Sequence, residues 1–428
     1  MFQLPRFKIP FFGGQGSSPS DSQRADCRFV KLASVPIHDV ETSADRRARS
    51  LKHLLKANHA NHSILYNQLR FHNHAPHLLG SAYLLGASHE ELHDIYEKEA
   101  EELEPWSDSP GEISKDDWRG FLGKREYQRA FVDFFEDQLV AKRYDWKLLL
   151  DEYLFQGREP LINGIIAGLA HPLIHLGYAY ELNSRTVAIE ALALAACCYN
   201  SLHKYIDDPA YTKPGEFRSQ SLLDILNKVR EDKRFDGLYD HRSGDISKVL
   251  VDKEGPLLEY WNAWELTDPT AQFRELQRTA TAVFLATEPP ASAKFDFFLV
   301  HLLTSSHAVR ILLPLVPHEH HVSLLRQWWL FTLAVYIAQT RPAIDLELIE
   351  GYGRLRDWES IRVAAVSGEH RSDAHFVKAL RAMGVANETW ADDEGDLFYQ
   401  KAASKFCNEF EHWGGFGTAD DVTYPEFE

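Results

Sequence analysis

Apolar residues recur at three- and four-residue spacing over long stretches of the chain, which is the period of an amphipathic helix. The clearest stretches are 44–57, 125–143 and 270–286. The alternating pattern of a strand is scarce, and the stretch 248–251 is too short to count. The pattern therefore predicts an all-α protein.

The sequence also marks where several helices begin and end. Ser88 followed by Glu91 predicts a capping box, and Ser221 followed by Asp224 makes a similar start signal. Gly86 is well placed to end the preceding helix, because glycine readily takes the left-handed conformation that follows a helix.

Four further stretches are apolar on every side, and we expect them to be buried central helices: 160–182, 185–202, 295–315 and 324–340. No connection between helices is long and polar enough to be a linker. We therefore predict one large helical domain over residues 25–428, with a division into two lobes near residue 210 as a variant. Residues 1–24 are rich in Gly, Ser and Pro and are expected to be a flexible leader.

Charge and cysteine content exclude several functions. The chain has 46 Lys and Arg against 63 Asp and Glu, a net charge of −17, whereas nucleic acids and anionic membranes need a basic face. Four cysteines without a CxxC make no disulfide framework, so we expect a reducing, cytoplasmic location. The uncharged stretch 160–180 contains His171, Pro172 and His175, which favours a buried helix with a polar site over a membrane span.

Histidine is unusually frequent, with 21 residues beside 2 methionines, and it is the commonest metal ligand. Residues 89–93 (HEELH) match the HExxH motif of zinc proteases. The motif opens a strongly acidic stretch, however, so we interpret it as part of a solvent-exposed helix.

Other motifs have simpler explanations as well. Glu90 with His93 and Glu409 with His412 are ExxH pairs of the di-iron type, kept as an alternative because the fold is helical. Residues 318–321 (HEHH) are interpreted as the polar start of the next helix. The sequence has no GxGxxG, P-loop or GxSxG motif, which disfavours a conventional flavin monooxygenase.

Histidines inside apolar stretches are the stronger signal. In FHNHAPHLL, Pro76 suits the first turn of a helix, which puts His72 and His74 on the entering segment and His77 on the first turn. In HPLIHLGY, His171 and His175 are four residues apart and share a helix face, beside an expected kink at the intervening proline.

Two more segments complete the pattern. His301 lies in an apolar stretch, in which His307 points to another face. His375 and Lys378 are three residues apart and share a face. Burying so many uncompensated histidines would cost roughly a few kcal/mol each, and one shared ion would compensate them. The four segments therefore predict a single buried metal site, and imidazole-rich ligation suits iron, copper or zinc.

These segments resemble the questin oxidase-like family, fungal proteins of anthraquinone and aflatoxin-type polyketide pathways. The resemblance rests on FHNHAPHLLGSAYLLGAS (71–88), HPLIHLGYAYE (171–181), DFFLVHLLTSS (296–306) and DAHFVK (373–378) and spans about residues 44–410. Ala179 stands where glycine is common in the family.

The resemblance implies an oxidoreductase that uses O₂, a non-heme iron dioxygenase cleaving a ring C–C bond of a (hydro)anthraquinone in fungal polyketide secondary metabolism. It implies a mononuclear Fe(II) bound by histidines and by a CO₂-derived carbamate on a lysine, here Lys378. The histidine candidates, five for what would be four ligand places, are His74, His171, His175, His301 and His375.

The implied carbamate has a chemical reason. A buried lysine has a depressed pKa and can be a neutral amine, which adds CO₂ to give an anionic oxygen ligand. Histidines supply only neutral nitrogen, so Lys378 would provide the negative charge that a carboxylate gives Fe(II) in a facial triad. An unligated His77 or His72 would serve as the base that deprotonates a substrate phenol.

Aromatic residues near the buried helices either line a flat apolar pocket or belong to the core: Trp328, Trp329, Phe331, Tyr336 and Phe298. Two other functions stay open, an NADPH-dependent Baeyer–Villiger-type oxygenase acting on a quinone and a non-catalytic helical partner protein. The expected partners are a small aromatic polyketide and O₂, with no nucleic acid and no membrane, and the number of subunits stays open.

Overall fold

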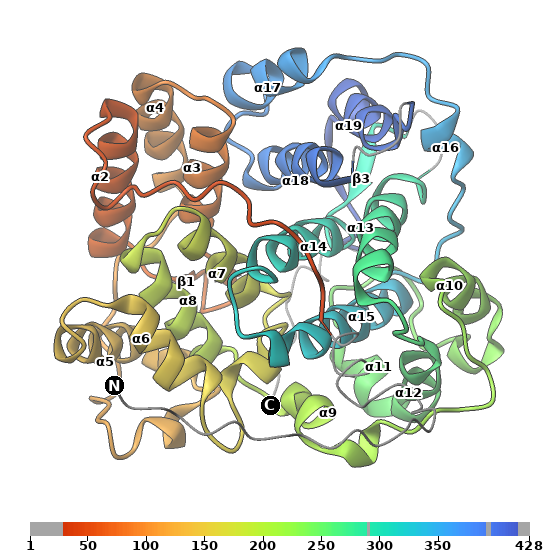
Figure 1. The fold of residues 1–428 in the computed structure, drawn as a ribbon, viewed down its shortest axis with the longest axis horizontal. Coiled ribbons are helices and arrows are strands. Elements are labelled where there is room, and N and C mark those ends of the chain that lie inside the picture. The colour runs from red at the N-terminus through yellow and green to blue at the C-terminus, as the bar shows by residue number, and fades with distance from the viewer. Residues whose placement is uncertain (1–28, 289–291, 391–394, 418–428) are drawn as a thin grey trace, which may run out of the picture.

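The computed structural model describes residues 29–288, 292–390 and 395–417. These residues form helices joined by turns and loops (Figure 1), and the fold is largely all-α, as predicted. The predicted leader, residues 1–24, lies outside the described residues. No helix in the described ranges is both long and apolar enough to cross a membrane.

Two helices without an exposed face stand at the centre of the fold. α7 (His171–Glu181) and α14 (Val300–Leu312) have every residue buried, and they pack against each other. α8 (Arg185–Cys197) packs against α7, and α15 (His321–Ala338) packs against α14. The predicted central helices therefore form the core, and this core joins the two halves of the chain on either side of residue 210.

Amphipathic helices from the first 150 residues cover part of this core: α2 (Arg46–Asn61), α3 (Ala75–Leu84), α4 (His89–Ala100), α5 (Gln128–Ala141) and α6 (Trp146–Leu150). α2, α3 and α4 lie together (Figure 1), while α5 and α6 pack against α8. The predicted helices 44–57 and 125–143 correspond to α2 and α5. Ser88 and Glu91 form the predicted capping box of α4, and Gly86 follows α3 with a φ of +101°.

The remaining helices complete the shell: α9 (Lys204–Asp207), α10 (Leu222–Glu231), α11 (Ser247–Asp252), α12 (Glu254–Ala263), α13 (Pro269–Leu285), α16 (Glu347–Glu350), α17 (Trp358–Ser367), α18 (Ala374–Trp390) and α19 (Phe398–Glu409). α13 is the predicted helix 270–286, and Ser221 caps α10 as predicted. α18 packs against α3 and α14, which brings the C-terminal part of the chain back to the core. The division into two lobes near residue 210 stays a prediction.

Strands are few and short in the described residues. β1 (Leu65–Tyr66) pairs antiparallel with β2 (Phe71–His72). β3 (Lys294–Asp296) pairs in parallel with β4 (His412–Gly414), which ties the C-terminal segment to the chain entering α14. Single turns link many elements, with a π turn at Asp151–Phe155 and 3₁₀ turns at Trp118–Phe121, Arg125–Tyr127, Leu161–Gly164, Ser201–His203, Pro209–Tyr211, Lys233–Phe235 and His318–His320.

Two runs of left-handed backbone precede segments that carry histidines. Residues 67–69, just before β2, have φ between 51° and 64°, and residues 168–170, just before α7, have φ between 52° and 61°. The left-handed conformation costs about 1–2 kcal/mol for each residue other than glycine. Such strain collects at functional sites, where the surrounding structure holds it in place.

The prediction of one continuous helix over 160–182 is wrong. The segment starts with the 3₁₀ turn Leu161–Gly164, passes through the left-handed residues 168–170, and becomes helical only at His171. Pro172 therefore lies in the first turn of α7, where its missing N–H needs no partner, and it does not kink the helix. As a result His171 stands at a helix start.

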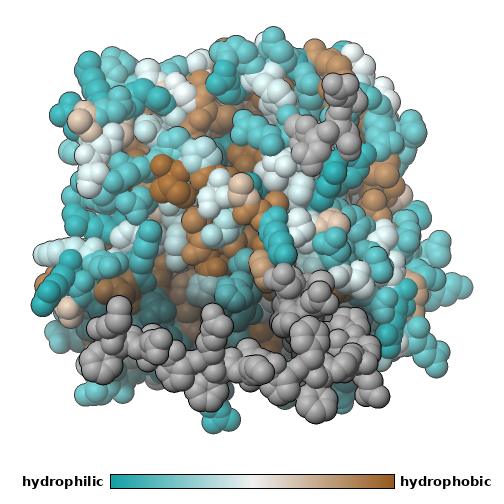
Figure 2. All heavy atoms as spheres, in the orientation of Figure 1, coloured by the Kyte–Doolittle hydropathy of each residue, from teal (hydrophilic) through white to brown (hydrophobic). Residues whose placement is uncertain are grey.

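Polar side chains dominate the exterior. Figure 2 shows that hydrophilic residues cover most of the face seen in Figure 1, with apolar residues gathered near its centre. Few charged side chains are buried among the described residues, so most of the charge of this part of the chain lies on the outside. Lys378 and Glu190 are among the buried ones.

Candidate metal centre

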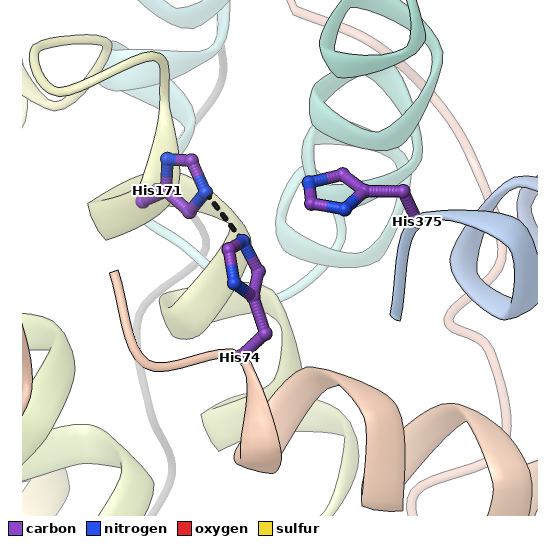
Figure 3. A group of neighbouring side chains, drawn as sticks. All are labelled: His74, His171 and His375. Carbon is purple, nitrogen blue, oxygen red and sulfur yellow. Dashed lines mark hydrogen bonds between the residues drawn. The ribbon is translucent and has the colours of Figure 1, made fainter. Parts of the chain in front are cut away.

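Four histidines from four separate segments, called here the histidine cluster, meet in the core. Nε2 of His74 lies 2.9 Å from Nε2 of His171, and Nε2 of His375 lies 3.3 Å from Nε2 of His301. His74 is at the N-cap position of α3, His171 is the first residue of α7, and His301 and His375 are the second residues of α14 and α18. The ring centroids of His74 and His375 are 4.6 Å apart, so the two pairs form one group. Figure 3 shows three of its members, His74, His171 and His375.

The spacing within the histidine cluster fits a single metal ion. A bond from a metal to an imidazole nitrogen is about 2.0–2.1 Å long, so two ligands at right angles on one ion lie about 3 Å apart. Both Nε2 pairs have this separation, and ligand atoms of His74, His171 and His375 all lie within 4.8 Å of one another. Across the described residues, this is the one group of three His, Cys, Asp or Glu side chains that meets this limit.

Backbone carbonyls set the tautomers of two of these rings. Nδ1 of His171 donates to the carbonyl oxygen of Gly168 at 2.7 Å, and Nδ1 of His301 donates to that of Phe297 at 2.8 Å. A carbonyl can only accept, so the proton is on Nδ1 and the lone pair on Nε2. Metal-bound histidines use this arrangement to fix ring orientation.

Burial keeps the histidine cluster uncharged. It lowers the pKa of His301 to about 3 and the pKa values of the other three rings well below their usual range. The nearby charge of Lys378 lowers all four further. Neutral imidazoles are the form that binds metals.

Lys378 lies in α18 one turn after His375, on the predicted shared face. Its side chain is 1% exposed, and its Nζ has no hydrogen-bond partner among the described residues. Burial lowers the pKa of Lys378 to about 7, against the opposing charges of Asp373 and Glu99. A substantial fraction of this amine is therefore neutral near pH 7 and able to act as a nucleophile.

A cavity of 570 Å³ opens onto the histidine cluster. His72, His74 and His375 form part of its wall. The other lining side chains are mainly aromatic or acidic: Tyr66, Phe71, Phe297, Phe298, Trp413 and Phe416, and Glu99, Glu102, Glu104 and Asp373. Cavities of this size with apolar walls and a few polar groups are typical of small-molecule sites.

Most of the aromatic residues considered for this pocket belong to the core instead. Of the five, Phe298 lines the cavity. Trp328 and Trp329 are fully buried in α15 and donate to the backbone carbonyls of Leu302 and Tyr260. Phe331 and Tyr336 are equally buried. Core packing satisfies these four side chains without a ligand.

The other site histidines lie around the cluster. His72 lines the cavity, and its Nε2 is 3.7 Å from Sγ of Cys198. His77 and His175 bond to each other, Nε2 to Nδ1, at 2.6 Å, and Nε2 of His175 faces Oε2 of Glu190 at 3.6 Å. Both ring nitrogens of His175 are therefore directed at partners outside the cluster. Neither of these two rings lines the cavity.

Residues outside the cluster follow the simpler interpretations. The HExxH stretch lies on α4, and residues 318–321 form a 3₁₀ turn leading into α15, as predicted. Glu409, of the second ExxH pair, instead bonds to Arg354 and Lys405. As expected, His307 faces away from the cluster, and its Nε2 accepts from Arg381 at 2.8 Å.

Two acidic residues near the site were not identified from the sequence. Glu99, near the C-terminal end of α4, lines the cavity, and burial raises its pKa to about 7. The sequence did not single out Glu99, because its neighbours in the chain are also mainly acidic. Glu190 is buried in α8, and its signal was available, since it is the one charged residue in TVAIEALALAACC.

The sequence matches known proteins over most of its length. The model of the family described as questin oxidase-like matches residues 71–383. A Baeyer–Villiger oxidase of Pestalotiopsis microspora is 27% identical over 367 residues, 77% of this chain and 79% of that protein. Questin oxidase of Aspergillus fumigatus is 27% identical over 379 residues, 81% of this chain and 83% of that protein.

A third relative, a Baeyer–Villiger monooxygenase of Aspergillus aculeatus, is 26% identical over 385 residues, which is 80% of this chain and 78% of that protein. The family match includes all four segments of the histidine cluster and Lys378. The chain therefore belongs to the questin oxidase-like family and is an enzyme of the oxidoreductase class.

Proposed function

We propose that this enzyme is a non-heme iron-dependent dioxygenase that cleaves a ring C–C bond of an anthraquinone or its reduced form in fungal polyketide secondary metabolism. The observation that carries the proposal is the group of His74, His171 and His375, whose ligand atoms all lie within 4.8 Å of one another. Nε2 of His301 lies 3.3 Å from that of His375, and the charge of the buried Lys378 acts on all four rings. Nitrogen ligands with one anionic oxygen suit Fe(II). The substrate class rests on the family and on its questin oxidase member.

The histidine cluster would hold the ion through its Nε2 atoms. The neutral amine of Lys378 would add CO₂, so that an N–C bond forms and one proton leaves, and a carbamate oxygen would complete the ligand set. Bound Fe(II) would supply a binding site for O₂ and one-electron chemistry. His175 has no place in this set, because its ring nitrogens are directed at His77 and Glu190.

The cavity would hold the substrate. Its aromatic walls, Phe297 and Phe298 among them, suit a flat apolar ring system, and its size is that of a small-molecule site. His72 lines the cavity and His77 does not, so His72 is the better base for a substrate phenol. Burial lowers the pKa of His72 well below its usual value, so its ring is neutral, which is the form a base has before it takes a proton.

Metal analysis tests the proposal directly. Protein purified without oxygen and supplied with iron should hold about one ion per chain. Labelling with ¹³CO₂ should give a carbamate signal in ¹³C NMR that is lost in Lys378→Met. Protein that binds no metal under these conditions would contradict the proposal.

A second candidate is favoured by the names of the relatives, several of which are Baeyer–Villiger oxidases or monooxygenases. Such an enzyme would insert one oxygen atom beside a quinone carbonyl and use NADPH as reductant. Turnover under ¹⁸O₂ separates the two. A dioxygenase puts both labelled atoms into product without NADPH, whereas a monooxygenase puts in one and consumes one NADPH per product.

A further inference from the structure

A line of five polar side chains, called here the polar line, leads from the histidine cluster to the surface: His77, His175, Glu190, His59 and Glu136. They come from α3, α7, α8, α2 and α5 in turn. Nε2 of His77 lies 2.6 Å from Nδ1 of His175. Further out, Nδ1 of His59 is 2.9 Å from Oε1 of Glu190, and its Nε2 is 3.1 Å from Oε1 of Glu136.

The central link joins His175 to Glu190. Nε2 of His175 and Oε2 of Glu190 face each other at 3.6 Å, and both side chains are 1% exposed. Within the described part of the chain, neither atom has a hydrogen-bond partner. Leaving buried polar atoms unpaired is unfavourable, so a small movement that brings these two atoms within hydrogen-bond distance is favourable.

The inner end of the polar line is buried near the histidine cluster, and its outer end is exposed to water. At the inner end, Nδ1 of His77 is buried and without a partner among the residues the structure describes, and the ring lies 5.6 Å from that of His74. At the outer end, the side chain of Glu136 is 45% exposed, in reach of water.

The hydrogen-bond directions are fixed by Glu190. Burial alone would raise its pKa, but the facing ring of His175 and the hydrogen bond from His59 lower it, so it is a carboxylate that can only accept. Nε2 of His175 is then a donor, its Nδ1 is an acceptor, and Nε2 of His77 donates to it. Burial alone would lower the pKa of His59, but its hydrogen bonds to Glu136 and Glu190 raise it to about 9, so this ring is a cation that donates from both nitrogens.

We propose that the polar line carries protons from the histidine cluster to the surface. A proton that binds Nδ1 of His77 lets the Nε2 proton pass to Nδ1 of His175. The Nε2 proton of His175 then passes to Glu190. The cationic ring of His59 releases its Nε2 proton to Glu136 and on to water. The ring then turns over, so that the nitrogen without a proton faces Glu190, takes the proton held there and restores the cation. One proton enters and one leaves, and no electrons move.

The polar line gives protons a route to water that does not pass through the cavity. The source of the protons rests on the proposed function: carbamate formation at Lys378 releases one proton, and deprotonation of a substrate phenol releases another. The described residues that line the cavity include none of the polar line. A flat substrate that fills the cavity would therefore leave this second route open.

Hydrogen exchange tests the proposal without metal, substrate or turnover. In apoprotein with ¹⁵N-labelled histidine, NMR measures how fast the Nε2 protons of His175 and His77 exchange with D₂O. We expect Glu190→Gln and His59→Gln to slow this exchange at least tenfold, because an amide cannot pass a proton on. Glu136→Gln, at the surface, should slow it less.

Matched controls separate proton transfer from loosened packing. His53→Gln, on the exposed face of α2, and Asp137→Asn, beside Glu136 on α5, should leave the exchange unchanged. Backbone amide protection should be the same in all variants. Exchange in Glu190→Gln and His59→Gln as fast as in the unmodified protein would overturn the proposal.

Turnover gives a second readout. In iron-loaded enzyme, Glu190→Gln should lower kcat with KM unchanged and increase the solvent isotope effect on kcat, which a purely structural role would not do. An unchanged isotope effect would count against the polar line. An enzyme without iron or turnover would instead overturn the proposed function, while the exchange result on apoprotein would stand.

Discussion

The imidazole ring of His72 lies flat against that of His171, with centroids 3.9 Å apart and planes inclined by 4°. Gly168 lies beside this stack. Its carbonyl accepts from His171, and a Cβ added to it would lie 2.8 Å from Sγ of Cys198 and 3.0 Å from Nε2 of His72. One backbone position thus controls the orientation of both rings.

We expect Gly168→Ala to lower the free energy of unfolding by about 1–3 kcal/mol, because its φ of +58° is left-handed and the added methyl group collides with Cys198. Bound iron should fall as well, because His171 must shift. Urea unfolding and metal analysis measure the two effects. Gly164→Ala is the control, since its Cβ would meet nothing closer than 3.5 Å. Full iron content in Gly168→Ala would contradict this role.

Asp373 holds the start of the helix that carries two site residues. Its Oδ1 accepts from the backbone N–H groups of His375 and Phe376 at 2.9 Å each, and its Oδ2 accepts from Nε1 of Trp413 at 2.7 Å. We expect Asp373→Ala to cost about 1–2 kcal/mol of stability and to weaken iron binding. Thermal unfolding and iron titration check this.

Asp357→Ala provides a matched comparison for that variant. Asp357 caps α17 by accepting from the N–H of Ser360 at 2.7 Å, and α17 carries no site residue. Its loss should cost a similar free energy of unfolding and leave iron affinity unchanged. Equal iron affinity in the two alanine variants would show that the cap of α18 does not position the site.

Lys378→Met should remove metal binding without lowering the free energy of unfolding of the apoprotein. The apoprotein should be as stable as the unmodified one or more so, because a buried amine without a described partner is replaced by an apolar side chain of similar size. Iron content should drop sharply, because the carbamate cannot form. Chemical unfolding of apoprotein and metal analysis test the two halves. Lys56→Met, on the exposed side of α2, should change neither quantity.

His59 should make stability depend on pH. Its pKa is about 9 in the folded protein and about 6.5 when unfolded. The folded state therefore holds the proton more tightly, and the stabilisation is fully present below pH 6.5 and is lost as pH rises to 9. The free energy of unfolding should fall over this window by up to about 3 kcal/mol relative to His59→Gln. Parallel pH curves for the two proteins, measured by urea unfolding, would refute this.

Local signals explain why the helices could be predicted. Apolar periodicity and caps such as Ser88 depend on residues three or four positions apart, so they are readable in the sequence alone. The start of α7 was not readable, because Leu169 and Ala170 rarely adopt positive φ and only the surrounding core holds them there. Pro172 was accordingly assigned a kink, although it lies in a first turn.

The sequence predicted which residue types form the site, but not which of their atoms contact one another. Histidines in apolar stretches pointed to a buried site, but which nitrogens meet depends on how four helices pack. His175 is one turn from His171 and yet bonds to His77. Aromatic side chains serve cores and cavities equally well, so nothing in the sequence separates Trp328 from Phe298. Glu99 could not be singled out either, because nothing in the sequence distinguishes it from the other acidic residues of α4 that do not line the cavity.

The members of the histidine cluster stand at positions 74, 171, 301 and 375, spread over most of the chain. During synthesis, the last of them leaves the ribosome only when most of the protein has been made. Because α18 closes the cluster by packing on α3 and α14, a nascent chain has no complete histidine cluster. If the cluster binds iron as proposed, acquisition of the ion is a late step that follows folding, and the amount of active enzyme in a cell depends on the iron supply to finished protein.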